Sequence, residues 1–296
     1  MSAIEDADLV AAYLAGDRSA LAAIYDRYSP SLYDTAASMT RSRHDAADVM
    51  QDVFLVAAER LGQLRDPHRL KPWVFAILRN EVFRRTGRKR RTVATDFTDP
   101  VAEMSLPPDH DDPTADAEYA ELAALVRGAA AGLDDRDRLV LELSVRQGLD
   151  GDDLAAALGV STQQSYSILH RTRQRTERAL GAFVVAHRGR NDCPELDRIL
   201  RGWDGQFTVL IRKRVARHVD GCDICDRSRR ALAPLALFGA APAFATPAGL
   251  RDRVLIATRQ VQPVGPDAGA GGIATYGFGA AGGFPAVAGS TQKLAL

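Results

Sequence analysis

Apolar residues recur at three- and four-residue steps along the N-terminal third of the chain, the spacing of helices that are apolar on one face. The stretch 43–91 contains two such helices, separated by a short polar loop with Pro67. Acidic side chains stay off the apolar face of the first helix, and basic side chains collect at the end of the second. The apolar positions are Val49, Val53, Val56, Ala57 and Leu61 in the first helix, and Trp73, Ile77, Leu78 and Val82 in the second.

Residues 6–40, upstream of this pair, show the same periodicity. Gly16 and Asp17 interrupt it, which predicts two helices. Ser29 and Pro30 indicate the start of a further segment, because serine caps helices and proline favours their first turn. We therefore expect residues 1–91 to form one compact helical domain.

A second helical domain is predicted over residues 118–186. Leu139 and Val140 are expected on the buried face of its first clear helix. Further along, a helix stopped by Gly159, a short turn and a second helix capped by Ser161 give the pattern of a helix-turn-helix. The predicted fold class is all-α, with two helical domains, a smaller helical domain and a Gly/Ala-rich tail.

The charge of the chain is balanced, with 38 basic and 38 acidic residues, so no overall field attracts it to nucleic acid. The charges are separated locally instead. No Lys or Arg occurs between Thr92 and Val126, and we expect residues 92–117 to be an acidic, proline-containing linker. Directly before it lies a basic run that suits a polyanion, made of Arg84, Arg85, Arg88, Lys89, Arg90 and Arg91.

All three cysteines fall in the last third, at Cys193, Cys222 and Cys225, and His218 precedes the last two. Thiolate and imidazole ligands at these spacings suit a structural Zn²⁺ site with four protein ligands. The four-residue step from His218 to Cys222 predicts that both lie on one face of a helix. A redox-active cysteine pair and three unconnected thiols are the alternatives. We place the zinc-binding domain at 187–232.

The end of the chain, 233–296, is predicted to be a C-terminal extension, partly of low complexity, with one short helix at 250–261. The longest apolar stretch, 231–250, contains three prolines and is a poor candidate for a membrane span. No signal-peptide pattern opens the chain, so we expect a cytoplasmic protein of two or three small domains. The phosphate-binding and nucleophile motifs of common enzymes are missing, so we do not expect catalysis.

The stretch 43–91 resembles region 2 of extracytoplasmic-function RNA polymerase sigma factors, group 4 of the sigma-70 family. Two motifs carry the resemblance: DAADVMQDVF from Asp45, and WVFAILRN from Trp73 with the basic run behind it. The resemblance implies binding to core RNA polymerase, at its β′ clamp helices and β subunit, through Asp48, Gln51 and Asp52. It implies contacts with promoter −10 DNA through Trp73, Arg79, Asn80, Arg84 and Arg85. The alternative is a helical pair with a solvated, charged rim.

The helix-turn-helix pattern resembles sigma region 4, whose second helix reads the promoter −35 element in the major groove. The family usually has an apolar residue, a lysine and an arginine where this chain has Ser165, Tyr166 and Ile168. Packing of this helix against a protein is therefore the alternative. Glutamine can bond adenine through two atoms. The candidate DNA contacts are Ser161, Gln163, Gln164, Ser165, Tyr166, His170, Arg171 and Arg173.

The cluster of three cysteines and one histidine, with the segment between its first two members, resembles the zinc-associated anti-sigma domain. In that family a small helical domain clamps a sigma factor and blocks its polymerase-binding surfaces. We hypothesise that the zinc domain docks on the two sigma-like domains and modulates their activity in cis. The alternative function is a stand-alone helix-turn-helix transcriptional regulator with a zinc or redox sensor domain.

Overall fold

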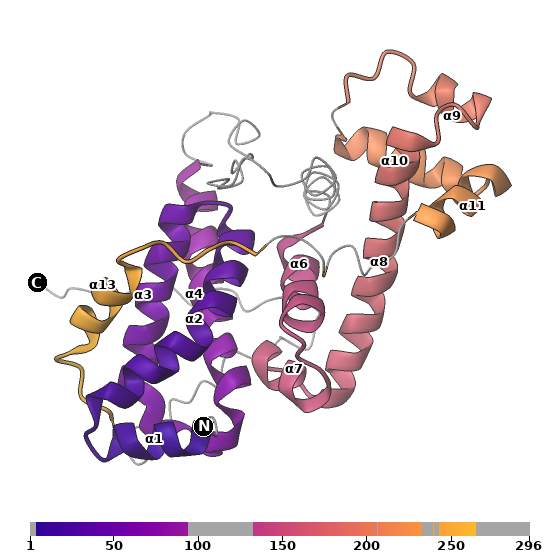
Figure 1. The fold of residues 1–296 in the computed structure, drawn as a ribbon. Coiled ribbons are helices and arrows are strands. Elements are labelled where there is room, and N and C mark those ends of the chain that lie inside the picture. The colour runs from indigo at the N-terminus through magenta and orange to yellow at the C-terminus, as the bar shows by residue number, and fades with distance from the viewer. Residues whose placement is uncertain (1–3, 94–132, 206, 233–238, 240–242, 265–296) are drawn as a thin grey trace, which may run out of the picture. The chain divides into compact units, whose positions relative to one another are not determined.

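A computed structural model describes residues 4–93, 133–205, 207–232, 239 and 243–264. Every regular element in these ranges is a helix, which confirms the predicted all-α class (Figure 1). The helices form two compact bodies. Apart from its first two residues, the linker predicted at 92–117 lies outside the described part of the chain.

Among the described residues, six α-helices build the first body. Four of them come from the N-terminal part of the chain, and their packed faces carry large buried side chains such as Tyr25, Phe54 and Phe75. The other two are distant in sequence and join the same body. Their bounds are α1 (Asp6–Leu14), α2 (Arg18–Thr40), α3 (Arg43–Arg60), α4 (Leu70–Val93), α7 (Gly151–Leu158) and α13 (Leu250–Thr258).

Helix α2 runs through Pro30 without a break, so the new segment predicted to begin at this proline is wrong. Proline removes one backbone hydrogen bond and strains the preceding turn. Tyr25, Tyr28 and Leu32 are buried on both sides of it, and this packing holds the helix together across the defect. The helix ends at Arg41, whose left-handed backbone (φ 56°) turns the chain into α3.

Helix α3 begins where the side chain of Ser42 accepts a hydrogen bond from the Asp45 amide (3.2 Å). After α3, two 3₁₀ turns, η1 (Leu61–Gln63) and η2 (Pro67–Arg69), carry the chain into α4. Serine caps satisfy amides that the first helical turn leaves without partners. The predicted pair of helices separated by a short polar loop is therefore confirmed.

Gly159 ends α7 in the left-handed region (φ 67°), as predicted for the helix-turn-helix. A Cβ at this position would lie only 2.8 Å from Nη1 of Arg79. Arg79 is buried, at 4% exposure, and its Nη1 donates to the Ala157 carbonyl oxygen (2.8 Å). The glycine is required both by its backbone conformation and by the guanidinium beside it.

We expect Gly159→Ala to lower the free energy of unfolding by about 2–4 kcal/mol, from left-handed strain plus displacement of a buried, hydrogen-bonded guanidinium. Chemical denaturation followed by circular dichroism measures this loss. The control is the same substitution in an Arg79→Ala background, where only the backbone strain of about 1–2 kcal/mol remains. Equal losses in both backgrounds would contradict the contribution of Arg79.

The second body contains α6 (Asp135–Leu141), most of α8 (Thr162–Arg188) and the three short helices that follow it. Asp134 caps α6 through a bond from the Asp137 amide (2.8 Å), and Asp137 accepts a bond from the Thr172 hydroxyl of α8 (2.7 Å). Five residues, Glu142–Arg146, continue α6 as a π-helical turn. The short helices are α9 (Pro194–Ile199), α10 (Val209–Val219) and α11 (Asp223–Leu232).

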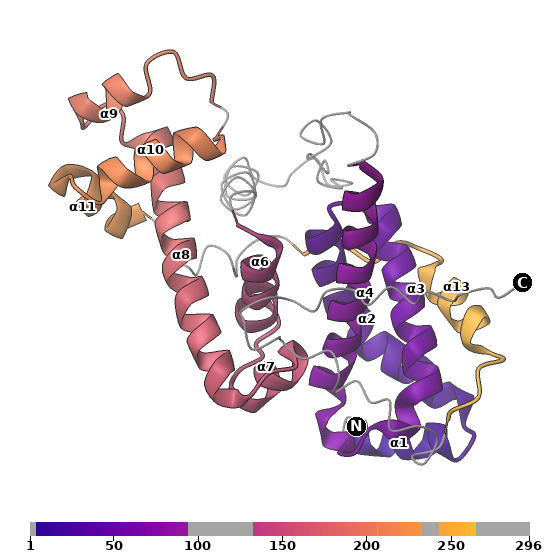
Figure 2. The same cartoon turned by 180° about the vertical axis from the view of Figure 1, so that it is seen from behind.

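Within the described ranges, no helix has both the length and the apolar character needed to cross a bilayer. The short helix predicted at 250–261 is confirmed as α13. It belongs to the first body, where it packs against α3, and both views place it on the flank of α3 that faces away from α4 (Figures 1 and 2).

Candidate functional site

The acidic residues of α3 and the first arginines of the basic run on α4 pair with one another. Arg84 donates to Asp52 (Nη2 to Oδ2, 2.6 Å), and Arg85 donates both to Asp45 (Nε to Oδ1, 2.9 Å) and to Asp48. Partial burial opposes the charge of both arginines, but the carboxylates outweigh it and raise the pKa of each guanidinium. Side chains predicted to bind polymerase and DNA therefore neutralise each other in the free chain.

These ion pairs are only partly shielded from water. The side chains of Asp48, Asp52 and Arg84 are 33%, 36% and 38% exposed, respectively. Exposed pairs of this kind stabilise a fold by about 0–1 kcal/mol, because water competes for both partners. An incoming protein or nucleic acid can therefore exchange them at little cost. The remaining predicted polymerase residue, Gln51, is half-buried on the same helix.

Two of the predicted −10 contacts are occupied within the first body. The guanidinium of Arg79 donates to the Asn80 side-chain oxygen (3.1 and 2.9 Å) as well as to Ala157 of α7. Burial lowers the pKa of Arg79 to about 10. Arg69 adds a bond to the Asp152 carbonyl oxygen (2.7 Å). Contact of Arg79 with DNA would require α7 to move away. Trp73 is only half-buried, so part of this residue is already accessible.

At the start of α8, Ser161 and Gln164 form a capping box. The Ser161 hydroxyl accepts from the Gln164 amide (3.3 Å), and the Gln164 side-chain oxygen accepts from the Ser161 amide (3.1 Å). Ser165 is buried, and its hydroxyl donates to the Thr162 carbonyl oxygen (2.8 Å). These three residues support the turn in this conformation. The remaining candidates along α8 are all exposed: Gln163, Tyr166, His170, Arg171 and Arg173.

The second body brings together all four predicted metal ligands, Cys193, His218, Cys222 and Cys225. Their ligand atoms lie within 4.8 Å of one another. Nε2 of His218 lies 3.3 Å from the sulfurs of Cys193 and Cys225, and the sulfurs of Cys193 and Cys222 are 3.9 Å apart. Ligands at zinc bond lengths in a tetrahedron lie about 3.5–3.8 Å from each other. The cluster can therefore bind a metal ion.

The prediction that His218 and Cys222 share one helix is wrong. His218 lies in the last turn of α10, which ends at Val219, and Cys222 lies in the turn before α11. Asp220 and Gly221 break the helix between them, with the Gly221 amide bonded to the His218 carbonyl oxygen (3.0 Å). This break lets the two ligands approach from different elements.

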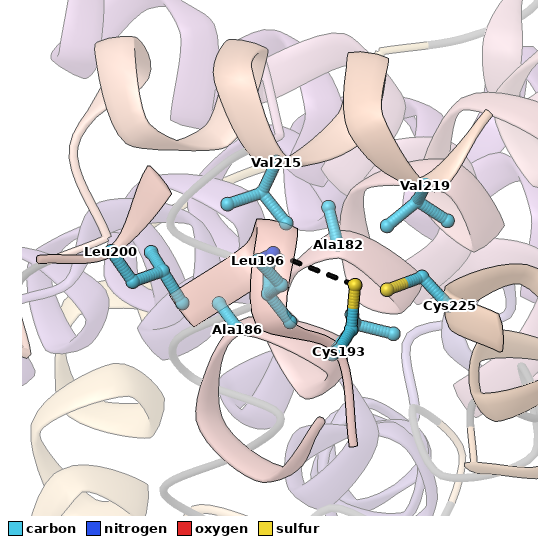
Figure 3. Packing of buried hydrophobic residues seen from close by; sticks show 9 residues of the cluster. Ala182, Ala186, Cys193, Leu196, Leu200, Val215, Val219 and Cys225 are labelled. Atoms are coloured by element: carbon cyan, nitrogen blue, oxygen red, sulfur yellow. Dashed lines mark hydrogen bonds between the residues drawn. The ribbon is translucent and has the colours of Figure 1, made fainter. Parts of the chain in front are cut away.

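Burial and hydrogen bonding fit a cation at this cluster. Cys193 and Cys225 are buried, and their sulfurs lie side by side beneath Val219 (Figure 3). Burial, reinforced by the neighbouring thiols, raises the pKa of Cys225 to about 12. Hydrogen bonds led by the Cys225 amide lower the pKa of Cys222 instead. A divalent cation would supply the positive charge that lets the buried sulfur become a thiolate ligand.

The C-terminal end of α8 supplies part of the core around the ligands. Ala182, Val185 and Ala186 pack with the apolar side chains of α9 and α10 in one buried cluster (Figure 3). The sequence prediction placed a domain boundary at 186/187, inside this structural unit. Apolar residues at 182, 185 and 186 continue the helical periodicity to the end of α8. This pattern could have shown that the end of α8 belongs to the same unit as the metal ligands.

Comparison with known proteins agrees with this geometry. The Sigma-70 region 2 family matches residues 24–92. The ECF RNA polymerase sigma factor SigM of Mycobacterium tuberculosis is 30% identical over 178 residues, which cover 60% of this chain and 85% of that protein. SigM of Bacillus subtilis is 26% identical over 57% of this chain and 96% of its own length. RNA polymerase sigma factor NccH of Alcaligenes xylosoxydans is 25% identical over 57% of this chain and 91% of its own length.

No solved structure matches the chain significantly. The region 2 match covers most of α2, all of α3 and all but the last residue of α4, the elements that hold the paired charges. The identity to SigM extends over most of that protein. The chain therefore belongs to the ECF family of RNA polymerase sigma factors.

Proposed function

We propose that this chain binds core RNA polymerase and directs promoter recognition and transcription initiation, without catalysis of its own. The family membership carries this proposal, because the sigma factors it resembles are named for RNA polymerase. The partly exposed carboxylates of α3 support it. They lie on a helix within the match to the Sigma-70 region 2 family, and their weak ion pairs leave them available to a partner.

In the finer form of this proposal, Asp48, Gln51 and Asp52 contact the β′ clamp helices of the polymerase. Trp73, with the arginines and Asn80 of α4, captures −10 bases that polymerase helps to unstack. Aromatic faces receive unstacked bases, and arginines hold the phosphates beside them. The exposed residues of α8 from Gln163 to Arg173 contact the −35 element.

The test measures affinity for core polymerase and promoter-dependent transcription with the purified full chain. We expect association with core polymerase at low ionic strength, weak binding of the free chain to promoter DNA, and transcripts that depend on both. Tight binding to duplex DNA without polymerase, together with no association with core, would overturn the proposal. That result would favour a stand-alone helix-turn-helix regulator.

We further propose that Cys193, His218, Cys222 and Cys225 hold a structural Zn²⁺ and that the module around it modulates sigma activity in cis. When bound, the ion would cross-link the start of α9, the end of α10 and the start of α11. The chain's own contribution is the buried core that these helices share with the end of α8. A conformational change in the metal module would thus reach the helix that carries the −35 candidates.

This cis effect is best tested without truncation, because removal of the metal module would expose Ala182, Val185 and Ala186 of α8. We expect Cys193→Ser to change promoter-dependent transcription at least about threefold, a change of about 0.7 kcal/mol in free-energy terms. The control is Ser228→Ala, because Ser228 lies in α11 but is neither a metal ligand nor a predicted DNA contact. Unchanged transcription by Cys193→Ser, after loss of zinc has been verified, would refute cis modulation.

A further inference from the structure

A hollow on the second body lies between the middle of α8 and the end of α11, apart from the metal ligands and the predicted DNA contacts. Both views place α11 beside the C-terminal part of α8 (Figures 1 and 2). The hollow has a volume of about 620 Å³. Of the six described residues that line it, four are arginines and one is acidic, so we call it the arginine hollow. Its lining is Gln174, Arg175, Glu177 and Arg178 of α8 with Arg229 and Arg230 of α11.

Gly181 of α8 makes room for the stem of Arg229. A Cβ on this buried glycine would lie 2.3 Å from Cγ and 2.6 Å from Cδ of the arginine. Glycine is less favourable than alanine inside a helix, and Gly181 is not among the residues with positive φ. The close approach of Arg229 therefore gives a physical reason for a glycine at this position.

Two carboxylates that are not part of the lining position the arginines of the hollow. Asp226 accepts bonds from Arg229 and from Nη2 of Arg230, the latter at 2.6 Å. Asp220 lies 3.7 Å from Nε of Arg178 and 3.8 Å from Nη1 of Arg229, distances too long for charged hydrogen bonds. Because a guanidinium has five N–H donors, these contacts orient the arginines without exhausting them.

The charge and the openness of the hollow indicate its ligand. Planar guanidinium groups bind phosphate oxygens through paired N–H donors. The side chains of Arg175, Arg178 and Arg230 are 57%, 65% and 76% exposed, respectively. Small ligands usually occupy sites that bury most of their surface. This open hollow is therefore better suited to a phosphate group of a long polymer that passes over it.

The hollow continues the face of α8 that carries a predicted DNA contact. Arg171, Arg175 and Arg178 follow one another at four- and three-residue steps, which places them on one face of the helix. Arg178 lies about 10 Å beyond Arg171 along the helix axis. Duplex DNA carries a phosphate about every 3.4 Å along each strand. A duplex bound at Arg171 therefore offers further phosphates within that length of helix.

We propose that the arginine hollow binds the phosphate backbone of duplex DNA beside the −35 element, so that α11 of the metal module adds phosphate contacts to those of α8. This inference rests on the proposed function and deepens it, because it gives the metal module a part in DNA binding. Contacts to phosphate fix position and affinity but carry no base sequence. Cys222 and Cys225 lie at the start of α11, so the fold of the module sets where its two arginines lie.

The principal test compares two full-length variants that each remove one arginine of the metal module. Arg230→Gln removes a charge from the hollow, whereas Arg198→Gln removes one from α9, outside it. The two arginines are matched, since they are 76% and 65% exposed and each pairs with a carboxylate of its own helix. The measurement is the affinity for promoter DNA of each chain bound to core polymerase, taken over a range of salt concentrations.

The logarithm of affinity falls against the logarithm of salt concentration with a slope of about 0.9 for each phosphate contact. We therefore expect Arg230→Gln to reduce the slope by about 0.9, and Arg198→Gln to keep the wild-type slope. The affinity ratio of wild type to Arg230→Gln then grows about threefold as the salt falls from about 200 to about 50 mM. The loss should be the same on a promoter with an altered −35 sequence. Equal slopes for all three chains would overturn the proposal.

Gly181→Ala disturbs the hollow without changing the charge of the chain. The added Cβ displaces the stem of Arg229, while alanine is the better helix former and α8 persists. Circular dichroism and metal content verify that the second body is intact. We expect the DNA affinity of this variant to fall and its salt slope to decrease, as in Arg230→Gln. A wild-type slope in Gly181→Ala would overturn the proposal.

Pyrophosphate tests the other source of the same chemistry, a small phosphorylated ligand. Tight binding of pyrophosphate that is lost in Arg230→Gln, with no change in the slope for DNA, would assign the hollow to such a ligand and overturn the proposal. If the wild type did not associate with core polymerase, the proposed function itself would fail. The salt slope of the free chain on duplex DNA would then still show whether Arg230 contacts a phosphate.

Discussion

Removal of the proposed zinc ion with a strong chelator is expected to unfold residues 193–232 while α1 to α4 keep their helical structure. The buried cluster around the ligands is small, and Cys193 and Cys225 are themselves members of it. Structural zinc sites contribute on the order of 10 kcal/mol of apparent folding free energy. So few apolar residues cannot replace that contribution, because small domains gain little from burial alone.

Zinc content per chain, circular dichroism and tryptophan fluorescence measure this effect. Trp203 packs beside His187, with ring centroids 4.8 Å apart, and reports on this region once Trp73 is replaced by phenylalanine. His218→Ala should lose the metal and the fluorescence transition, whereas His170→Ala, at an exposed position of α8, should keep both. A wild-type chain purified without metal and folded over 193–232 would contradict the expectation, as would full zinc retention by His218→Ala.

The parts of the fold that local pattern controls could be predicted from the sequence. Periodicity predicts α3 and α4, Gly159 predicts the end of α7, and cysteine spacing predicts the ligand cluster. Each of these features depends on residues a few positions apart. The two wrong predictions are also local. At Pro30, packing keeps α2 continuous in spite of the proline. Between His218 and Cys222, Asp220 and Gly221 end the helix that the four-residue spacing had predicted.

The contacts between distant segments could not be predicted in this way. Nothing in the local pattern of α4 shows that Arg79 is covered by α7, or that Arg84 is paired with Asp52. The docking of α13 on α3 depends on three buried residues that would equally suit another surface. Such contacts depend on complementary surfaces whose positions are set only when the whole body has folded.

The acidic residues of α3 that pair with α4 are expected to have a large effect on polymerase binding. Asp48→Asn together with Asp52→Asn is expected to weaken binding to core polymerase on the order of a hundredfold. Charged hydrogen bonds contribute about 1.5–3 kcal/mol each, and the lost pairs within the chain offset only a small part of this. Equilibrium binding to core polymerase measures the change. Asp8→Asn, on an exposed residue of α1, is the control that removes one negative charge elsewhere in the same body.

The same double variant should respond in the opposite direction to DNA. Neutral asparagines hold Arg84 and Arg85 less strongly, although Glu81 and Asp45 still pair with them. The freed positive charge should raise the affinity of the isolated chain for single-stranded DNA about two- to fivefold at low salt, with a steeper salt dependence. If the variant bound polymerase as tightly as the wild type, α3 would not be the polymerase-binding helix. If polymerase binding fell but DNA binding was unchanged, the arginines would not be restrained by these carboxylates in solution. The two measurements together therefore separate the role of the acidic residues from that of their partners.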